Sequence, residues 1–336
     1  MRKLGLGLLI LAVAGTTAWC TGALEYSTLL PSSLRSPAAL LFPVATAASF
    51  LLVRRRRRAL AGFAIAAGAV IAAWLAIPAS NDRDWQPEVA VAPHATLDGD
   101  RVTIHGVRNF RYRSETDFDP HWEDRSYDLR ELDSLDVVAS YWSGPHIAHI
   151  LLSFGFGGKD YVAISIETRK ERGEVYSTLG GFFKLYELVY VVADERDLIG
   201  VRTTYRQPPE DVYVYRVGVP RERIRRLFLD YLRGMNDLAD HPRFYNTLTA
   251  NCTNVLAYIV NRRAPRTLPR DLSWYLPGYS DEYLMRQGFI ARDGGSIERT
   301  KRLHDLASHR SAIAAFASAP PTTFSARLRA LPAAGV

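Results

Sequence analysis

Three apolar segments near the N-terminus, interrupted by a run of five arginines, constrain this 336-residue chain more than any other feature. Each segment is close to the length of about 20 residues that a helix needs to cross a bilayer, and they cover residues 4–24, 37–53 and 59–78. Arg54 to Arg58 lie between the second and the third. Because basic loops stay cytoplasmic, we expect the N-terminus inside, residues 25–36 in an outside loop, and everything after Ser80 outside.

The charge of the chain follows the same topology. Arg2, Lys3 and Arg54 to Arg58 account for the net charge of +7, so the rest of the chain is neutral overall. This distribution argues against a nucleic-acid partner. Cleavage of residues 1–23 as a signal peptide is an alternative that changes the number of spans but not the side of the large domain. Of the two cysteines, Cys20 lies in the first apolar segment, so we expect no intramolecular disulfide with Cys252.

The remaining sequence predicts one extracytoplasmic domain of the α+β class. Strand-like alternation recurs along it, and residues 221–239 form an amphipathic helical pattern. The Ala/Pro/Ser-rich end of the chain predicts a disordered tail. We therefore divide the chain into a membrane region at 1–79, a linker without periodicity at 80–100, the domain at 101–310 and a low-complexity tail at 311–336.

Residues 146–170, HIAHILLSFGFGGKDYVAISIETRK, consist of two β-rich runs around a Gly-Gly turn, which predicts a hairpin. If Phe154 faces Tyr161 or Val162, His149 lies opposite Ile166 or Glu167. Glu167 could then hold the His149 imidazole in one tautomer, as the third group of a nucleophile–base pair does. A half-buried strand histidine beside a solvated carboxylate is the structural alternative.

Cys252 lies within FYNTLTANCTNVLAYIVNR, residues 244–262, where turn-prone residues precede an apolar run with helical spacing. The pattern predicts a helix that begins within a residue of Cys252. A helix N-terminus and a nearby imidazole favour the thiolate, so Cys252 is a candidate nucleophile. The backbone N–H of Cys252 or of Thr253, at the helix start that Asn251 precedes, could bind an oxyanion. A buried, inert cysteine is the alternative.

Three arginines follow strand-like segments and are candidates for binding an anionic group such as a lipid phosphate: Arg169, Arg196 and Arg202. Surface arginines without such a role are the alternative. His146 and His149 are three residues apart, so on one strand they point to opposite faces and would not share a metal. No HExxH or paired CxxC spacing occurs in the sequence. We therefore expect no metal site and no cofactor.

The order of these groups, His149 on a strand, Glu167 on the next strand and Cys252 at a helix start, reverses that of papain-like enzymes and is that of their circularly permuted branch. Segments of the sequence resemble the Lnb N-terminal periplasmic domain family of bacteria: IAHILLSFGFG at 147–157, SIETRKERGEVYS at 165–177 with YELVYVVADERDLIGVRT at 186–203, and FYNTLTANCTN at 244–254. The resemblance covers roughly residues 100–285 and leaves the apolar segments outside.

The resemblance implies a permuted papain-like, NlpC-type domain in which an antiparallel sheet packs against the cysteine-bearing helix. It implies Cys252 as nucleophile, His149 as base and Glu167 as orienting group. The reaction implied is transfer of an acyl chain from a phospholipid to the amino terminus of a lipoprotein, by a multi-pass protein of the bacterial inner membrane with a periplasmic domain. A cysteine amidase or peptidase acting on cell-wall peptides and a non-enzymatic anchored binding module remain alternatives.

Overall fold

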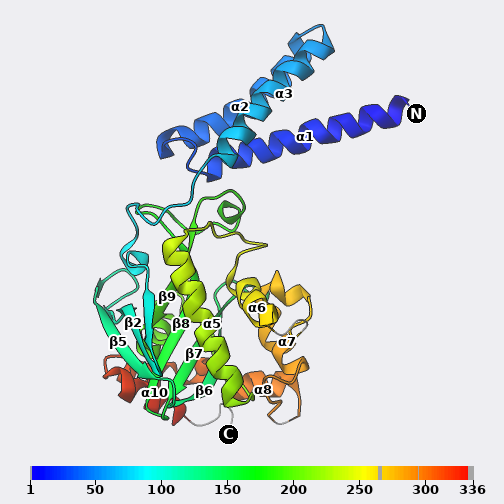
Figure 1. Ribbon diagram of the computed structural model, residues 1–336. Coiled ribbons are helices and arrows are strands. Elements are labelled where there is room, and N and C mark those ends of the chain that lie inside the picture. The colour runs from blue at the N-terminus through cyan, green and yellow to red at the C-terminus, as the bar shows by residue number, and fades with distance from the viewer. Residues whose placement is uncertain (1, 264–266, 294, 332–336) are drawn as a thin grey trace. The chain divides into compact units, whose positions relative to one another are not determined.

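The computed structural model of the protein describes residues 2–263, 267–293 and 295–331 (Figure 1). The chain divides into two units, and each has its own hydrophobic core. The first unit, which we call the helical unit, consists of Met1–Ser80, Gly173–Glu187 and Arg243–Thr247. The second, the sheet unit, consists of Asn81–Arg172, Leu188–Pro242 and Leu248–Val336.

Three helices dominate the helical unit and are long and apolar enough to cross a membrane: α1 (Arg2–Tyr26), α2 (Ser32–Leu52) and α3 (Arg56–Leu75). They confirm the three predicted apolar helices, with shifted ends. α2 begins earlier than expected because Pro31 directly precedes its first residue, and a proline fits the start of a helix. α3 ends earlier because Pro78 disfavours helical backbone at the residue before it. Cys20 is buried between these helices, against Phe63 and Ala67.

An eight-stranded sheet forms the centre of the described part of the sheet unit, in the order β1-β2-β9-β8-β7-β6-β10, with β5 also paired to β2. The strand pairs with a defined register are antiparallel except β2 with β9, which is parallel. The sheet is therefore mixed but mostly antiparallel. The strands are β1 (His94–Asp98), β2 (Arg101–Arg108), β5 (Trp122–Asp128), β6 (Leu132–Tyr141), β7 (Ala148–Phe156), β8 (Asp160–Arg169), β9 (Glu187–Ala193) and β10 (Asp211–Arg216). β3 (Arg111–Tyr112) and β4 (Phe118–Asp119) form a separate small hairpin.

Helix α5 (Arg221–Asp240) covers one face of the sheet and lies in front of it in Figure 1. Its buried residues recur at helical spacing, as the sequence predicted. Phe228 on α5 packs on Phe154 and Phe156 of β7, with ring centroids 4.9 and 5.5 Å apart. Alternation along β7 turns Ser153 to the opposite face. There Ser153 Oγ donates to Glu195 of α4 (Glu195–Gly200) at 2.6 Å.

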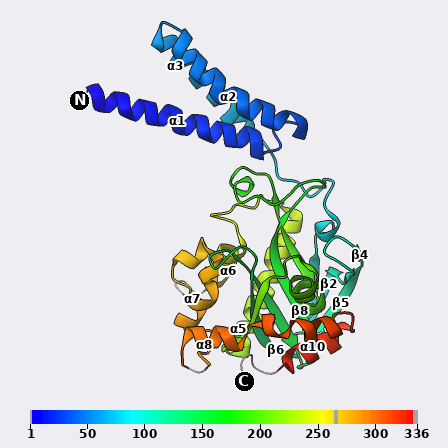
Figure 2. The ribbon, with the colours of Figure 1, turned by 180° about the vertical axis from the view of Figure 1, so that it is seen from behind.

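The opposite face of the sheet is covered by α4, by the π-helical turn η3 (Val201–Tyr205), and by the C-terminal elements η6 (Leu306–His309), α9 (Arg310–Phe316) and α10 (Pro321–Arg329), as Figure 2 shows for α10. The expectation of a disordered tail is wrong for residues 311–331, and residues 332–336 lie outside the described part of the chain. Ile313 and Phe324 are fully buried in the core, and Arg329 binds Glu195 and Asp136. Buried apolar side chains therefore anchor this Ala/Pro/Ser-rich segment, namely Ile313, Phe316, Phe324 and Leu328.

Residues 81–100 are also part of the sheet unit rather than a structureless linker. They contain the short turn η1 (Pro87–Val89) and strand β1. Trp85 and Val89 are buried in the same core as the C-terminal helices. The sequence expectation failed here because two isolated apolar residues show no periodicity. Trp85 and Val89 nevertheless pack into a core whose other residues are distant in the sequence.

The remaining described elements follow α5 along the chain: α6 (Cys252–Arg263), η4 (Leu272–Trp274), η5 (Pro277–Tyr279), α7 (Ser280–Arg286) and α8 (Ile297–Leu303). α6 packs on β7 and β8, so the hairpin and the helix that carries Cys252 are neighbours.

Candidate active site

The β7–β8 hairpin places His149 and Glu167 side by side. Gly157, Gly158 and Lys159 form its turn, and the two glycines have φ of 58° and 65°, the left-handed backbone that favours glycine. Phe154 pairs with Val162, which confirms the predicted register. The same register carries His149 to a position opposite Glu167. His149 Nε2 lies 3.2 Å from Glu167 Oε1.

Ser165 links the same two side chains and was missed by sequence reasoning. Its Oγ lies 2.5 Å from His149 Nε2 and donates to Glu167 Oε1 at 2.7 Å. Since Ser165 gives its proton to Glu167, its oxygen is free to accept one from Nε2–H. Residues 165 and 167 share a face of β8, so the alternation of the strand was the available signal.

Asn251 defines the start of α6, as the sequence predicted. Its Oδ1 accepts hydrogen bonds from the backbone N–H groups of Thr253 at 3.0 Å and Asn254 at 2.9 Å. Asn254 returns the contact, because its Oδ1 accepts from the N–H of Asn251 at 2.8 Å. This reciprocal cap resembles a capping box and fixes Cys252 as the first residue of the helix.

The capping hydrogen bonds also distinguish the two backbone N–H groups proposed to bind an oxyanion, those of Cys252 and Thr253. The N–H of Thr253 is bound by Asn251. Among the described residues, the N–H of Cys252 has no hydrogen-bond acceptor. It therefore is the group at the helix start that remains available to a ligand, in the field of the helix dipole.

His149 and Cys252 are close enough for the charge of the Cys252 thiolate to act on the imidazole. With Nε2 held by Ser165 and Glu167, Nδ1 is the ring nitrogen left to face the thiol. Burial alone would lower the pKa of His149. The charge of Glu167, the charge of the Cys252 thiolate and the hydrogen bonds to both raise it to about 9. The imidazole is therefore protonated at neutral pH and places a positive charge beside Cys252.

Glu167 is held ionised by its neighbours. Burial alone would raise its pKa, but the charge and hydrogen bond of His149, the charge of Arg202 and the Ser165 hydroxyl together hold the pKa well below its usual value. Arg202 is 2% exposed, and its guanidinium donates to Glu167 Oε1 at 2.8 Å. Glu210, which is paired with Arg206, lies 3.8 Å from the other side of Arg202.

The three candidate arginines have different surroundings. Arg202 belongs to the His149–Glu167 cluster. Arg169 donates to the backbone oxygens of Val89 and Ala90 and stacks on Trp85 at 4.3 Å.

Arg196 donates to Phe110 O at 3.2 Å and to the side chain of Asn109. All three arginines are buried. Their contacts are with different parts of the chain, so the structure does not bring them together around one anion.

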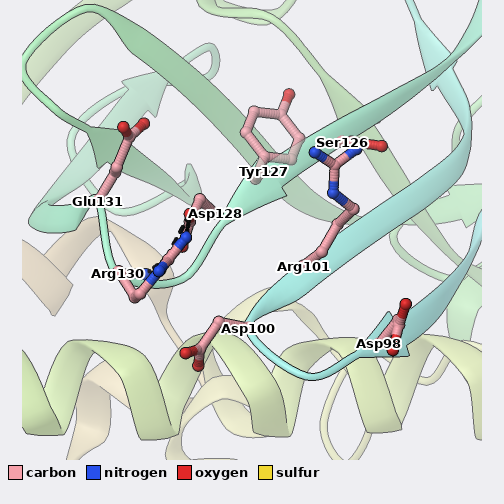
Figure 3. A pocket seen from close by; sticks show the side chains of 8 residues that line it. All are labelled: Asp98, Asp100, Arg101, Ser126, Tyr127, Asp128, Arg130 and Glu131. Carbon is pink, nitrogen blue, oxygen red and sulfur yellow. Dashed lines mark hydrogen bonds and ion pairs between the residues drawn. The ribbon is translucent and has the colours of Figure 1, made fainter.

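A cavity of about 620 Å³ lies away from this cluster, between the β1–β2 turn and the end of β5 (Figure 3). Its lining carries both charge signs, and Arg130 is paired with Asp128 at 2.6 Å. Cys252, His149 and Glu167 are not part of the lining. Within the described ranges, no group of three or more His, Cys, Asp or Glu side chains is placed to hold a metal ion.

The fold and the site together define a membrane-anchored protein whose mostly antiparallel sheet holds a cysteine–histidine–glutamate cluster at the start of a helix. Residues 118–277 match the family model of the Lnb N-terminal periplasmic domain. The match contains Cys252, His149 and Glu167, and it supports the resemblance found in the sequence motifs. With the three apolar helices, it indicates a membrane-anchored protein with a periplasmic domain. Neither the curated proteins nor the solved structures give a match to the chain.

Proposed function

We propose that this protein is a thiol acyltransferase, anchored in the bacterial inner membrane by several spans, that transfers an acyl chain from a phospholipid to the amino terminus of a lipoprotein through a thioester at Cys252. The observation that carries the proposal is the linked set of Cys252, His149 and Glu167. It combines a nucleophile, a base with a raised pKa and an orienting carboxylate.

In the first half of the reaction, Cys252 Sγ attacks the ester carbonyl of the lipid, and the thiol proton resides on His149. The negative charge that develops on the carbonyl oxygen is stabilised by the N–H of Cys252. The tetrahedral intermediate then collapses. The carbon–oxygen bond breaks, His149 protonates the departing alcohol, and an acyl thioester remains on Cys252.

In the second half, the amino group of the acceptor attacks the thioester. His149 takes a proton from the attacking nitrogen, the carbon–sulfur bond breaks, and the products are an amide and free Cys252. Glu167 and Ser165 keep Nε2 of the ring occupied, so Nδ1 stays directed at the reacting atoms in both halves. Arg202 keeps the Glu167 carboxylate ionised and in place.

Exposed apolar side chains near the start of α6 favour an acyl chain as the transferred group. The backbone oxygen of Trp274 accepts a hydrogen bond from Asn251 Nδ2 at 3.2 Å, so η4 lies against the helix start. Around it, four apolar residues are between 37% and 59% exposed: Leu248, Leu272, Tyr275 and Leu276. Exposed apolar side chains that gather beside a nucleophile suit a hydrocarbon ligand.

The position of the chain in the membrane supports the same substrate class. Arg54 to Arg58 would hold the connection between α2 and α3 in the cytoplasm, which puts the sheet unit in the periplasm. The order of His149, Glu167 and Cys252 along the chain supports a circularly permuted papain-like domain, in which a strand supplies the base before a helix supplies the nucleophile.

The test compares full-length protein and Cys252→Ala in vesicles of phosphatidylethanolamine and phosphatidylglycerol, with a diacylated lipopeptide as acceptor. We expect N-acylated lipopeptide and lysophospholipid from the unaltered protein only, with a loss of several orders of magnitude in the variant. Cys252-dependent cleavage of cell-wall peptides without acyl transfer would instead indicate an amidase or peptidase. Activity in the cell that survives Cys252→Ala would indicate a binding module.

A further inference from the structure

Residues 173–187, here called the surface segment, pack against the ends of α1 and α3 within the helical unit. The segment contains the turn η2 (Gly180–Phe182). Phe183, which follows this turn, lies among three aromatic residues of the helices. Its ring centroid is 6.0 Å from that of Trp19 and 6.2 Å from that of Tyr26, and its backbone oxygen accepts from Trp74 Nε1 at 3.0 Å.

Lys184 fastens the surface segment to the end of α3. Its Nζ donates to the backbone oxygens of Trp74 at 3.0 Å and of Leu75 and Ile77 at 3.2 Å. These carbonyl groups lie at and just after the last turn of α3, where a cation complements the helix dipole. Nζ lies 4.6 Å from the Trp74 ring centroid as well.

Lys184 has a positive φ of 60°, a backbone conformation that is rare for a residue other than glycine. Such a conformation is adopted where the surrounding contacts require it. Here the four contacts of the ammonium group supply that requirement, so the segment is docked specifically rather than loosely associated.

The surface segment is also held together internally. Tyr186 is fully buried, and its hydroxyl donates to Val175 O at 2.8 Å and accepts from the N–H of Ser177 at 2.7 Å. Thr247, from the other short stretch of the helical unit, donates through its N–H to Gly181 O at 3.2 Å. The segment is therefore a built structure with a fixed position on the helix ends.

The helices give the depth of the surface segment relative to a bilayer. Trp74 follows Arg56 by 18 residues, which corresponds to about 27 Å along a helix and nearly matches the hydrocarbon thickness of about 30 Å. With the arginines at the cytoplasmic border, Trp74 lies at the opposite border, where tryptophan and tyrosine are enriched. Phe183 and Lys184 contact Trp74 and therefore lie at this border too.

Two large apolar side chains of the segment are largely exposed. Val175 is 81% exposed and Leu179 is 56% exposed. Exposed aliphatic side chains on a rigid segment at the edge of the hydrocarbon layer are what membrane-surface elements present to lipid.

We propose that residues 173–187 form a membrane-surface element that inserts Val175 and Leu179 among the phospholipids of the outward-facing leaflet. Lipid is the partner that this apolar surface contacts, because the segment packs against the outer ends of the membrane-crossing helices. The proposal concerns how the protein sits on the bilayer, so it goes beyond the proposed acyl transfer and does not depend on it. Another stretch of the helical unit, Arg243–Thr247, ends five residues before Cys252 in the sequence.

The experiment labels single cysteines with an environment-sensitive dye in a Cys20→Ala, Cys252→Ser background. The test position is Leu179→Cys, and the matched control is Leu97→Cys, since Leu97 of β1 is 57% exposed. The protein is reconstituted in vesicles of phosphatidylethanolamine and phosphatidylglycerol that carry nitroxide-labelled lipid. We expect blue-shifted emission and quenching by the lipid nitroxide at 179, and quenching by aqueous iodide at 97. Equal iodide quenching at both positions, with no lipid quenching, would overturn the proposal.

A second pair of variants tests the docking. A Cβ on Gly22 of α1 would lie 2.4 to 3.0 Å from three ring atoms of Phe183, whereas a Cβ on Gly15 meets nothing within 4 Å. In the labelled protein, Gly22→Ala should displace Phe183 and reduce lipid quenching at 179, and Gly15→Ala should leave it unchanged. Unchanged quenching in both variants would refute the docking described here. These fluorescence measurements need no catalytic activity. The membrane-surface proposal can therefore be refuted while the acyltransferase proposal stands, and the acyltransferase proposal can be refuted while the membrane-surface proposal stands.

Discussion

The charge of Glu167 raises the pKa of His149, and Glu167→Gln removes this charge with little change of shape. Glu167 Oε1 lies 3.2 Å from His149 Nε2. At an effective dielectric constant of about 20, this separation corresponds to roughly 5 kcal/mol, or about four pKa units. Burial of His149 opposes that contribution, and the pKa nevertheless reaches about 9. Without the carboxylate we expect the pKa of His149 to fall to its usual value of about 6.5 or below.

The raised pKa of His149 determines the pH range in which its imidazole is charged. In the unaltered protein the imidazolium is present up to about pH 9 and is lost as the pH rises through that value. In Glu167→Gln it would already be lost near neutrality. Cys252 then loses the positive charge beside it near neutral pH.

The reactivity of the Cys252 thiol can be measured without a substrate, by its alkylation with iodoacetamide in a Cys20→Ala background. We expect the rate near pH 7 to fall at least about tenfold in Glu167→Gln, which corresponds to one pKa unit, and the rate profile to move toward alkaline pH. Glu171→Gln is the matched control, because Glu171 pairs with Arg83 at 2.8 Å. An unchanged profile in Glu167→Gln would refute the idea that this carboxylate sustains the imidazolium.

Three further substitutions test separate parts of the structure. Ser165→Ala removes the hydroxyl bridge but leaves the direct contact of His149 with Glu167. We therefore expect a loss of about 1 kcal/mol, or roughly fivefold in acyl-transfer rate. The control Ser153→Ala should leave the rate unchanged. Asn251→Ala removes the cap of α6 and should lower the free energy of unfolding by about 1 kcal/mol in denaturant titrations of the full-length protein. Phe324→Ala should cost about 3–5 kcal/mol, seen as a lower Tm, if the C-terminal helices belong to the core; a Tm equal to that of Leu97→Ala would contradict this.

The parts of the fold that follow from local pattern were predictable from the sequence. The apolar segments identify the three membrane helices, and the Gly157-Gly158 turn sets the register that brings His149 to Glu167. Asn251 before an apolar run identifies the start of α6. Each of these rests on residues that are close together in the chain.

The parts that depend on distant partners were not predictable. Phe324 packs into a core with strands more than a hundred residues earlier in the chain, and nothing in its own Ala/Pro/Ser-rich neighbourhood indicates this. Arg202 reaches Glu167 from a π-helical turn whose geometry has no simple sequence pattern. Ser165 is inconspicuous in a β-rich run, although it bridges His149 and Glu167. The sequence therefore indicated that His149 and Glu167 lie together and that α6 begins at Cys252, but not which residues hold Glu167 in place.

The most direct measurement is detection of an acyl group on Cys252 itself. Full-length protein is incubated with phosphatidylethanolamine vesicles without acceptor, quenched in acid and digested, and the peptide that contains Cys252 is analysed by mass spectrometry. We predict a mass increase of one fatty acyl chain on Cys252, lost on treatment with hydroxylamine and reduced in His149→Ala. An unmodified Cys252 in protein that still transfers acyl chains to the lipopeptide would contradict the thioester mechanism.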